Sequence, residues 1–204
     1  MTLILSALLF SISSNLDNIV VGTAYGVKKI KIGVIANLII AVVTTTGTFL
    51  SMSVGTYIST FLPNFVANAL GAVIIIFLGI YFATQSIIKL RTNTKSKELA
   101  LKDITDMIEY AEKSDLDNSG DINMKEALLI AFGLTFNNLG TGVAASITGV
   151  SIQFTVIATF ILSIITITIG EAVGNHILGK IWGKYAPLIS GVLLILLGIM
   201  EFLN

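Results

Sequence analysis

The sequence of Ala7–Ala24, ALLFSISSNLDNIVVGTA, recurs in the second half of the chain as Ala127–Ala144, ALLIAFGLTFNNLGTGVA. The copies agree at polar and glycine positions, which carry more weight than matched leucines, and Asp17–Asn18 aligns with Asn137–Asn138. Internal similarity of this kind is typical of a duplicated structural unit. The repeat therefore predicts a chain built from two related halves.

Composition places the chain in a membrane. Of its 204 residues, 54% are hydrophobic and 12% are charged, whereas soluble chains carry about 25% charged residues. Nine of the twelve carboxylates lie between Glu98 and Glu126, flanked by apolar stretches long enough to cross a bilayer, which takes about 20 residues. We therefore expect an integral protein of the lipid bilayer. It has no cysteine for a disulfide or a thiolate ligand, and no basic surface for nucleic acid.

The apolar stretches define six predicted transmembrane spans, which should be helices because backbone groups cannot stay unpaired in lipid. The spans cover residues 3–26, 32–60, 65–88, 126–148, 152–176 and 186–203. An odd number of spans per half inserts the second copy of the repeat upside down, as in transporters whose substrate site lies between inverted repeats. We expect an all-α integral membrane protein with two inverted three-helix repeats. Its predicted parts are a first repeat at 1–90, a cytoplasmic loop region at 91–125 and a second repeat at 126–204.

Small and hydroxyl residues recur along one face of the second and fifth spans, at steps of three and four. They are Thr44, Gly47, Ser51 and Gly55 in the second span, and Ser163, Thr166, Gly170 and Gly174 in the fifth. Small residues let helix backbones approach closely in a membrane. Close helix packing is the main interpretation of these stripes, and a hydroxyl-lined path along the same face is a secondary one.

The basic residues predict the orientation. All twelve lysines and arginines fall in the connections that follow the first, third and fifth spans, on one side of the membrane. Cytoplasmic loops carry an excess of such residues, so both termini should be extracytoplasmic in a multi-pass protein of the cell membrane. The first span lacks a basic start and a cleavage site of small residues, so it should be retained rather than removed as a signal peptide.

Asp17 is the most informative residue, because it lies well inside the first span. An ionised carboxylate at mid-membrane costs about 2.5–3.5 kcal/mol on insertion scales, and no span contains a lysine or arginine to form an ion pair. With Asn18 and the repeat-related Asn137 and Asn138, it can supply the hard oxygen ligands that suit calcium, magnesium or manganese. The alternative is a hydrogen-bonded polar seam that joins the first and fourth spans around a protonated aspartate.

Glu171 and His176, near the cytoplasmic end of the fifth span, are weaker candidates. Glu171 is a candidate metal ligand or gating group of the membrane site, although residues at such positions are more often interfacial and solvated. His176 is the only histidine in the chain and lies at the membrane edge, so no Ser-His-Asp triad can be assembled. No phosphate-binding loop is present either, and we do not expect an enzyme.

A second candidate metal site lies in the charged region, where Asp115–Glu126 has the sequence DLDNSGDINMKE. Its residues fill the ligand positions of a calcium-binding EF-hand loop, with glycine at position six where such loops turn sharply. The predicted ligands are Asp115, Asp117, Ser119, Asp121 through its carbonyl, and the bidentate Glu126. Ser96–Ser114 can form the entering helix, and the fourth span is the exiting one. We expect calcium as the cofactor here, either to regulate the protein or only to stabilise it, although calcium loops usually pair and no second loop exists.

Three stretches of this chain resemble those of known membrane proteins. They are SNLDNIVVGTAYGVKKIKI at Ser14–Ile32, DLDNSGDINMKEALL at Asp115–Leu129 and FNNLGTGVAASI at Phe136–Ile147. The chain resembles the YtaF-type sporulation membrane proteins, which are similar to the MntP-like manganese efflux pumps of the LysE-type exporter superfamily. The resemblance implies six helices in two inverted triplets and the export of a divalent cation. The pumps carry an aspartate in both copies of the motif, which matches Asp17 here, whereas the second copy has Asn137.

These observations predict a divalent metal cation transporter, an exporter of manganese or calcium, with a cytoplasmic calcium-binding loop. The alternative is a non-transporting membrane protein that senses calcium or holds partners through its cytoplasmic loop. Asp17 distinguishes the two, because a scaffold has no use for a carboxylate at mid-membrane. The sequence leaves open the coupling ion and whether the chain forms a homo-oligomer.

Overall fold

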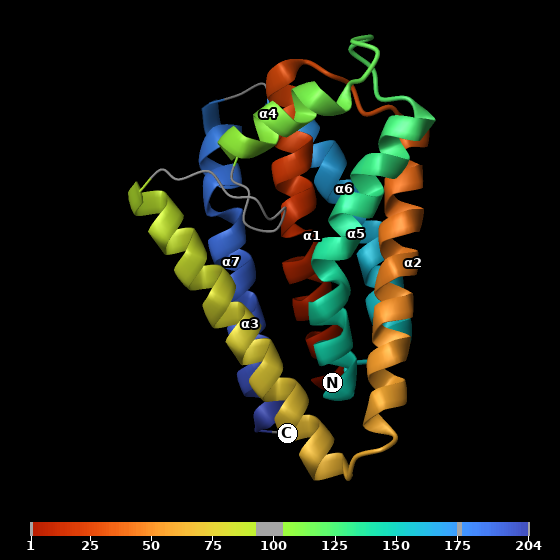
Figure 1. The fold of residues 1–204 in the computed structure, drawn as a ribbon, viewed down its shortest axis with the longest axis vertical. Coiled ribbons are helices and arrows are strands. Elements are labelled where there is room, and N and C mark those ends of the chain that lie inside the picture. The colour runs from red at the N-terminus through yellow and green to blue at the C-terminus, as the bar shows by residue number, and fades with distance from the viewer. Residues whose placement is uncertain (1, 93–103, 175–176, 204) are drawn as a thin grey trace.

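The computed structural model describes residues 2–92, 104–174 and 177–203, and these are helical apart from short connections. The helices are α1 (Thr2–Lys28), α2 (Val34–Ser59), α3 (Asn64–Thr92), α4 (Ile104–Ser114), α5 (Met124–Ile147), α6 (Ile152–Gly174) and α7 (Ile177–Phe202) (Figure 1). Within the described residues, five helices are long and apolar enough to span a membrane singly, and α5 is a sixth candidate that is bent by 46°. The all-helical membrane architecture predicted from the sequence is confirmed.

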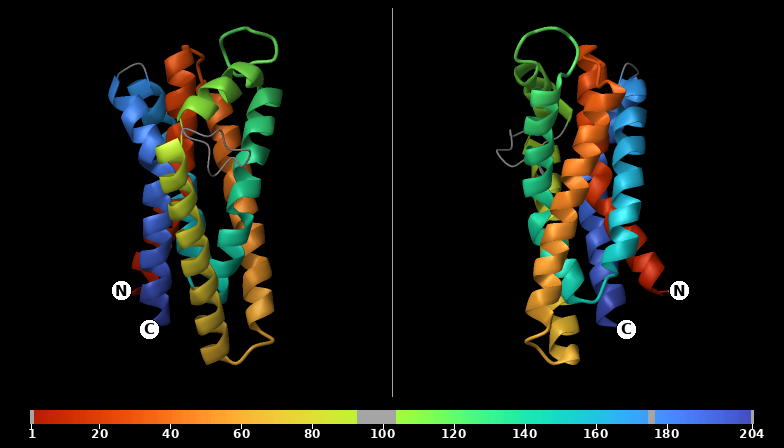
Figure 2. Two further views of the ribbon diagram at one scale, coloured as in Figure 1. Left: turned by 60° about the vertical axis from the view of Figure 1, so that its left-hand side comes forward. Right: turned by 90° about the vertical axis from the view of Figure 1, so that its right-hand side faces the viewer.

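The long helices lie side by side in one bundle, and α4 with the following acidic loop, Asp115–Glu126, lies across one end of it (Figures 1 and 2). Both chain termini lie at the other end. We call these the loop end and the terminal end. α1 runs toward the loop end, whereas α5 starts there and runs in the opposite direction.

The two halves of the chain pack crosswise: α1 lies against α6, α2 against α5, and α3 against α7. Glycines permit these contacts. An added Cβ at Gly22 would meet the main chain of α6, and one at Gly170 or Gly174 would meet the main chain of α1. One at Gly55 would meet the main chain of α5. The stripes of α2 and α6 are thus surfaces for close helix packing, as expected from their small residues.

Polar side chains lie inside the bundle, whereas large apolar side chains lie on its surface. Asn15, Asn18 and Ser163 are buried, and Phe77 and Phe136 are exposed. A soluble protein has the reverse distribution. The outer surface is therefore suited to lipid chains, and the interior provides the hydrogen-bonding groups from which a polar site can be built.

The end of the chain differs from the prediction. The apolar segment Tyr185–Phe202 matches the predicted sixth span, but α7 begins at Ile177 and continues through Pro187. The connection predicted ahead of this span is therefore mostly helical, because α7 extends beyond the segment that is apolar enough to cross a membrane. His176 and the predicted start of the entering helix, residues 96–103, lie outside the described residues.

Candidate functional site

A ladder of polar side chains on α1 occupies the interior of the bundle. Asn15 and Asn18 lie one turn apart, so their side chains share a helix face. Asn18 Nδ2 donates to Asn15 Oδ1 at 2.8 Å and to Ser163 Oγ of α6 at 3.1 Å. Toward the terminal end, Thr159 Oγ1 donates to Ser11 Oγ at 3.3 Å. These bonds join α1 to α6 along the contact that the glycines bring close.

Asp17 lies beside this ladder and is half-buried. Its Oδ1 accepts a hydrogen bond from the Asn18 backbone N–H at 3.0 Å. Asn138 of α5 lies at a similar level, because its Nδ2 donates to the carbonyl of Ser14, one turn before Asp17, at 3.0 Å. A carboxylate that keeps part of its surface accessible can exchange a proton or an ion with its surroundings, which a fully packed one cannot.

The bend of α5 lies at the position that the internal repeat aligns with Asp17. The helix runs as Met124–Phe136 and Asn138–Ile147, with 46° between the two parts. The helix assignment is continuous through the bend, and transporters place binding sites where transmembrane helices depart from regular geometry near the middle of the membrane. The side chain of Asn137, at the bend itself, lies outside the part of the chain that the structure describes. Of the predicted membrane residues, α1 and α5 thus bring Asp17, Asn18 and Asn138 to one level.

Glu171 of α6 is half-buried and lies nearer the loop end than Asp17 does. Its main chain packs against Gly22 and Gly26, which lie about 8–14 Å beyond Asp17 along α1 at about 1.5 Å per residue. Its carboxylate lies near the Ile32 backbone N–H and near the charge of Lys31. The structure therefore does not bring Glu171 together with Asp17, and places it at the loop end of the α1–α6 contact.

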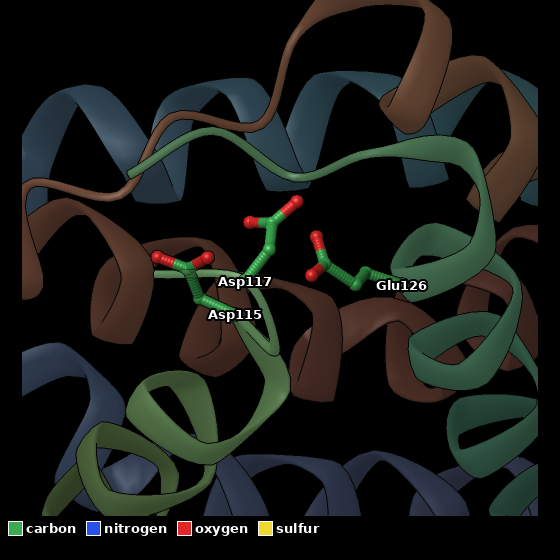
Figure 3. Close-up of side chains that lie close together, drawn as sticks. All are labelled: Asp115, Asp117 and Glu126. Carbon is green, nitrogen blue, oxygen red and sulfur yellow. The ribbon is translucent and has the colours of Figure 1, made fainter. Parts of the chain in front are cut away.

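In the acidic loop, the carboxylates of Asp115, Asp117 and Glu126 converge (Figure 3). One oxygen of each lies within 4.8 Å of the others. Two oxygens bound to one calcium ion at 2.3–2.6 Å can lie no more than about 5 Å apart, so the three groups are spaced to share an ion. Hydrogen bonds from Ser119 hold the pKa of Asp117 below its usual value, and its carboxylate is ionised at neutral pH.

Hydrogen bonds hold the loop in this shape. Asp115 accepts from the backbone N–H groups of Ser119 and Gly120, both at 3.0 Å, and Ser119 Oγ donates to the Asp121 carbonyl at 2.9 Å. Gly120 has a φ of 77°, a left-handed conformation that glycine adopts without strain. Glu126 also forms the capping box that starts α5. Of the five predicted ligands, the structure thus brings the carboxylates of Asp115, Asp117 and Glu126 together.

The loop has a partner that sequence reasoning missed. In the connection between α1 and α2, the Lys31 N–H donates to the Gly120 carbonyl, and the Lys31 carbonyl accepts from the Ile122 N–H, each at 2.9 Å. Pairing of calcium loops predicts a second acidic loop, whereas this partner is short and basic. In the sequence, basic and apolar residues alternate around Lys31, a pattern that is typical of a strand. The two flanking isoleucines, Ile30 and Ile32, are buried in the same cluster as Ile122.

Comparison with known proteins gives a family and two relatives. Residues 99–202 match the family described as "Putative manganese efflux pump". The chain is 30% identical over 209 residues to the "Probable sporulation protein YtaF" of Bacillus subtilis (strain 168), covering 96% of this chain and 98% of that protein. It is 30% identical over 88 residues to the "Putative manganese efflux pump MntP" of Clostridium perfringens (strain SM101 / Type A), covering 43% of this chain and 41% of that protein. No solved structure matches the chain.

Proposed function

Because the chain belongs to the YtaF-type, MntP-like family of membrane proteins, we propose that it exports divalent metal cations, with manganese as the first candidate and calcium as the second. The family is described as one of efflux pumps and not as one of enzymes. The observation that carries the proposal is Asp17, a half-buried carboxylate in the middle of α1. Intramembrane carboxylates are costly and mark ion or proton pathways in membrane proteins.

In this proposal the two halves, at 1–90 and 126–204, are inverted repeats. The crosswise packing supports it. In two such repeats α5, α6 and α7 are the counterparts of α1, α2 and α3. The α1–α6 and α2–α5 contacts are then equivalent, and α3–α7 joins two corresponding helices. α1 and α5, the first long helices of the two halves, run in opposite directions. A pseudo-two-fold axis in the membrane plane produces such packing and places the substrate site between the repeats.

The proposed cation site consists of Asp17, Asn18, Asn137 and Asn138, at the level where α5 bends. Carboxylate and amide oxygens suit manganese and calcium. A site with one carboxylate binds a divalent cation weakly enough to release it, which conduction and transport require. Glu171 is then a gating group or a ligand at the loop end. The competing interpretation is a polar seam around a protonated Asp17, and it predicts that asparagine at this position is harmless.

The loop end is proposed to face the cytoplasm. The basic residues that the structure describes, among them Lys28, Lys31 and Lys125, belong to segments at this end, and an excess of lysine and arginine is typical of cytoplasmic loops. Both termini are then extracytoplasmic. In this orientation the acidic loop, part of the region 91–125, samples the cytoplasmic concentration of its ion.

We assign calcium to the acidic loop and propose that the ion regulates transport. A short route connects the loop to Glu171, at the loop end of the α1–α6 contact. Lys31 pairs with the loop at Gly120 and Ile122, and the backbone N–H of the next residue, Ile32, lies near the Glu171 carboxylate. An ion that orders the loop thereby holds the α1–α2 connection and the carboxylate at the loop end. It shifts the balance of inward-open and outward-open states by no more than its differential affinity for them. If the ion has equal affinity for the two states, it only stabilises the fold and does not regulate transport.

A calcium sensor or scaffold that does not transport is the second candidate. The loop geometry favours it, because the loop can bind an ion without any path through the membrane. Cells grown in excess manganese separate the two functions: an exporter lowers their manganese content, and Asp17→Asn abolishes that effect. Glu109→Gln removes an exposed carboxylate on α4 that pairs with Lys113, and as the matched control it should leave export intact. Equal manganese content with and without the parent protein would favour the sensor.

A further inference from the structure

A third intramembrane carboxylate, Glu201, is buried near the terminal end of α7. Only 7% of its surface is exposed, and it accepts a hydrogen bond from Ser6 of α1, which is 2% exposed. A buried carboxylate is unfavourable unless it is paired, protonated or bound to a cation. Neither the inverted repeat nor the acidic loop accounts for a carboxylate at this position.

Glu201 lines a cavity of about 590 Å³ at the terminal end of the bundle. The wall is rich in uncharged oxygen-bearing side chains, contributed by Thr56, Ser59, Asn64, Asn68, Ser146, Thr148 and Gln153. The same carboxylate also borders a neighbouring cavity of about 340 Å³. A carboxylate among amide and hydroxyl oxygens is the donor set that hard divalent cations prefer.

No lysine, arginine or histidine lines either cavity within the described residues. Every lysine and arginine of the sequence falls in the segments assigned to the loop end. The negative charge of Glu201 therefore has no basic side chain in the cavity wall to compensate it. A mobile cation in the cavity would compensate this charge.

The three carboxylates outside the acidic region lie at three depths. Glu171 packs beside Gly22 and Gly26, Asp17 lies near the middle of α1, and Glu201 binds Ser6. Ser6 and Asp17 are separated by about 16 Å along α1, at about 1.5 Å per residue. Glu201 thus lies on the far side of Asp17 from the acidic loop, where an exported ion would leave.

We propose that Glu201 and its cavity form a second divalent-cation subsite, at which the ion leaves the protein on the terminal side. The inference rests on the proposed export function. The subsite has one carboxylate and otherwise neutral oxygens, so the ion keeps several of its waters and binds weakly. Weak binding at a wet exit site favours release over retention.

Manganese binding to the detergent-solubilised protein tests the subsite directly, read from the loss of the free-ion electron paramagnetic resonance signal. The starting protein carries Asp17→Asn and Asp115→Ala, which remove the other two proposed sites. We expect weak residual binding that Glu201→Gln reduces at least tenfold and that Ser6→Ala leaves in place, because Ser6 only holds the carboxylate. No residual binding, or residual binding that survives Glu201→Gln, would overturn the subsite.

A second variant tests the subsite independently, in case Glu201→Gln fails to fold. Asn68 is exposed on the cavity wall, and Asn68→Lys places a positive charge where the ion would lie without changing a buried residue. Residual manganese binding should also fall at least tenfold in this variant, and its persistence would overturn the subsite. Because the readout is binding, failure of Asp17→Asn to stop export would contradict the membrane site alone and leave the result on Glu201 intact.

Discussion

Replacing Glu126 by glutamine separates the two roles of this side chain in the acidic loop. Glu126 is buried, and its oxygens accept hydrogen bonds from the backbone N–H groups of Leu116 at 2.8 Å and Asn123 at 2.9 Å. Glutamine has the same size but a single carbonyl oxygen, so one of these N–H groups then faces an amide NH₂. A buried group left without its partner costs about 1–3 kcal/mol. We expect the ion-free variant to lose that much free energy of unfolding.

The second role proposed for Glu126, as a calcium ligand, would show only when the ion is present. A ligand at 100 times its Kd stabilises the folded state by about 2.7 kcal/mol. If loss of the bidentate carboxylate weakens binding a hundredfold, the same calcium concentration stabilises the variant by only about 0.4 kcal/mol. Thermal unfolding of the detergent-solubilised parent and variant, each with calcium and with a chelator, measures both effects. A calcium-induced shift that Glu126→Gln keeps in full would refute the ion site and leave Glu126 as a helix cap.

Three further predictions concern packing, coupling and topology. Gly22→Leu should force α1 and α6 apart and lower the free energy of unfolding by about 1–3 kcal/mol, as measured by chemical unfolding. Gly140→Leu is the control and should not lower it, because an added Cβ at Gly140 meets nothing within 4 Å. Lys31→Pro removes the N–H that donates to the loop, so calcium should still bind but no longer change the transport rate, and unchanged regulation would contradict the coupling route. A cysteine at Asn64 should be labelled from outside intact cells and one at Ser96 should not, while the opposite labelling would reverse the orientation.

Features that depend only on the local sequence of a segment were predictable. A transmembrane helix must pair its own backbone groups in lipid, so apolar length alone located α2 and α6 to within a few residues. The turn of the acidic loop is also set by local sequence, because the backbone at position 120 is left-handed and Gly120 adopts this conformation without strain. The stripe that includes Gly55 needed only helical spacing to be recognised as a packing surface.

Features that depend on contacts between distant segments were not predictable in this way. The partner of the acidic loop is Lys31, and only the folded chain brings it to Gly120. The bend of α5 at Asn137 is not marked by a proline in the sequence. The burial of Glu201 was not predictable either. It lies at the end of a span, where carboxylates are usually solvated, and its burial comes from α1 and the cavity wall.

Manganese flux through the protein reconstituted in liposomes tests the central claim, that Asp17 belongs to the site of the transported ion. The parent should carry manganese down an imposed gradient and Asp17→Asn should not. Both should bind calcium at the acidic loop with equal affinity, which shows that the variant is folded. Flux through Asp17→Asn equal to that of the parent would contradict the membrane site, and absence of flux through the parent under the same gradient would contradict the proposed transport itself.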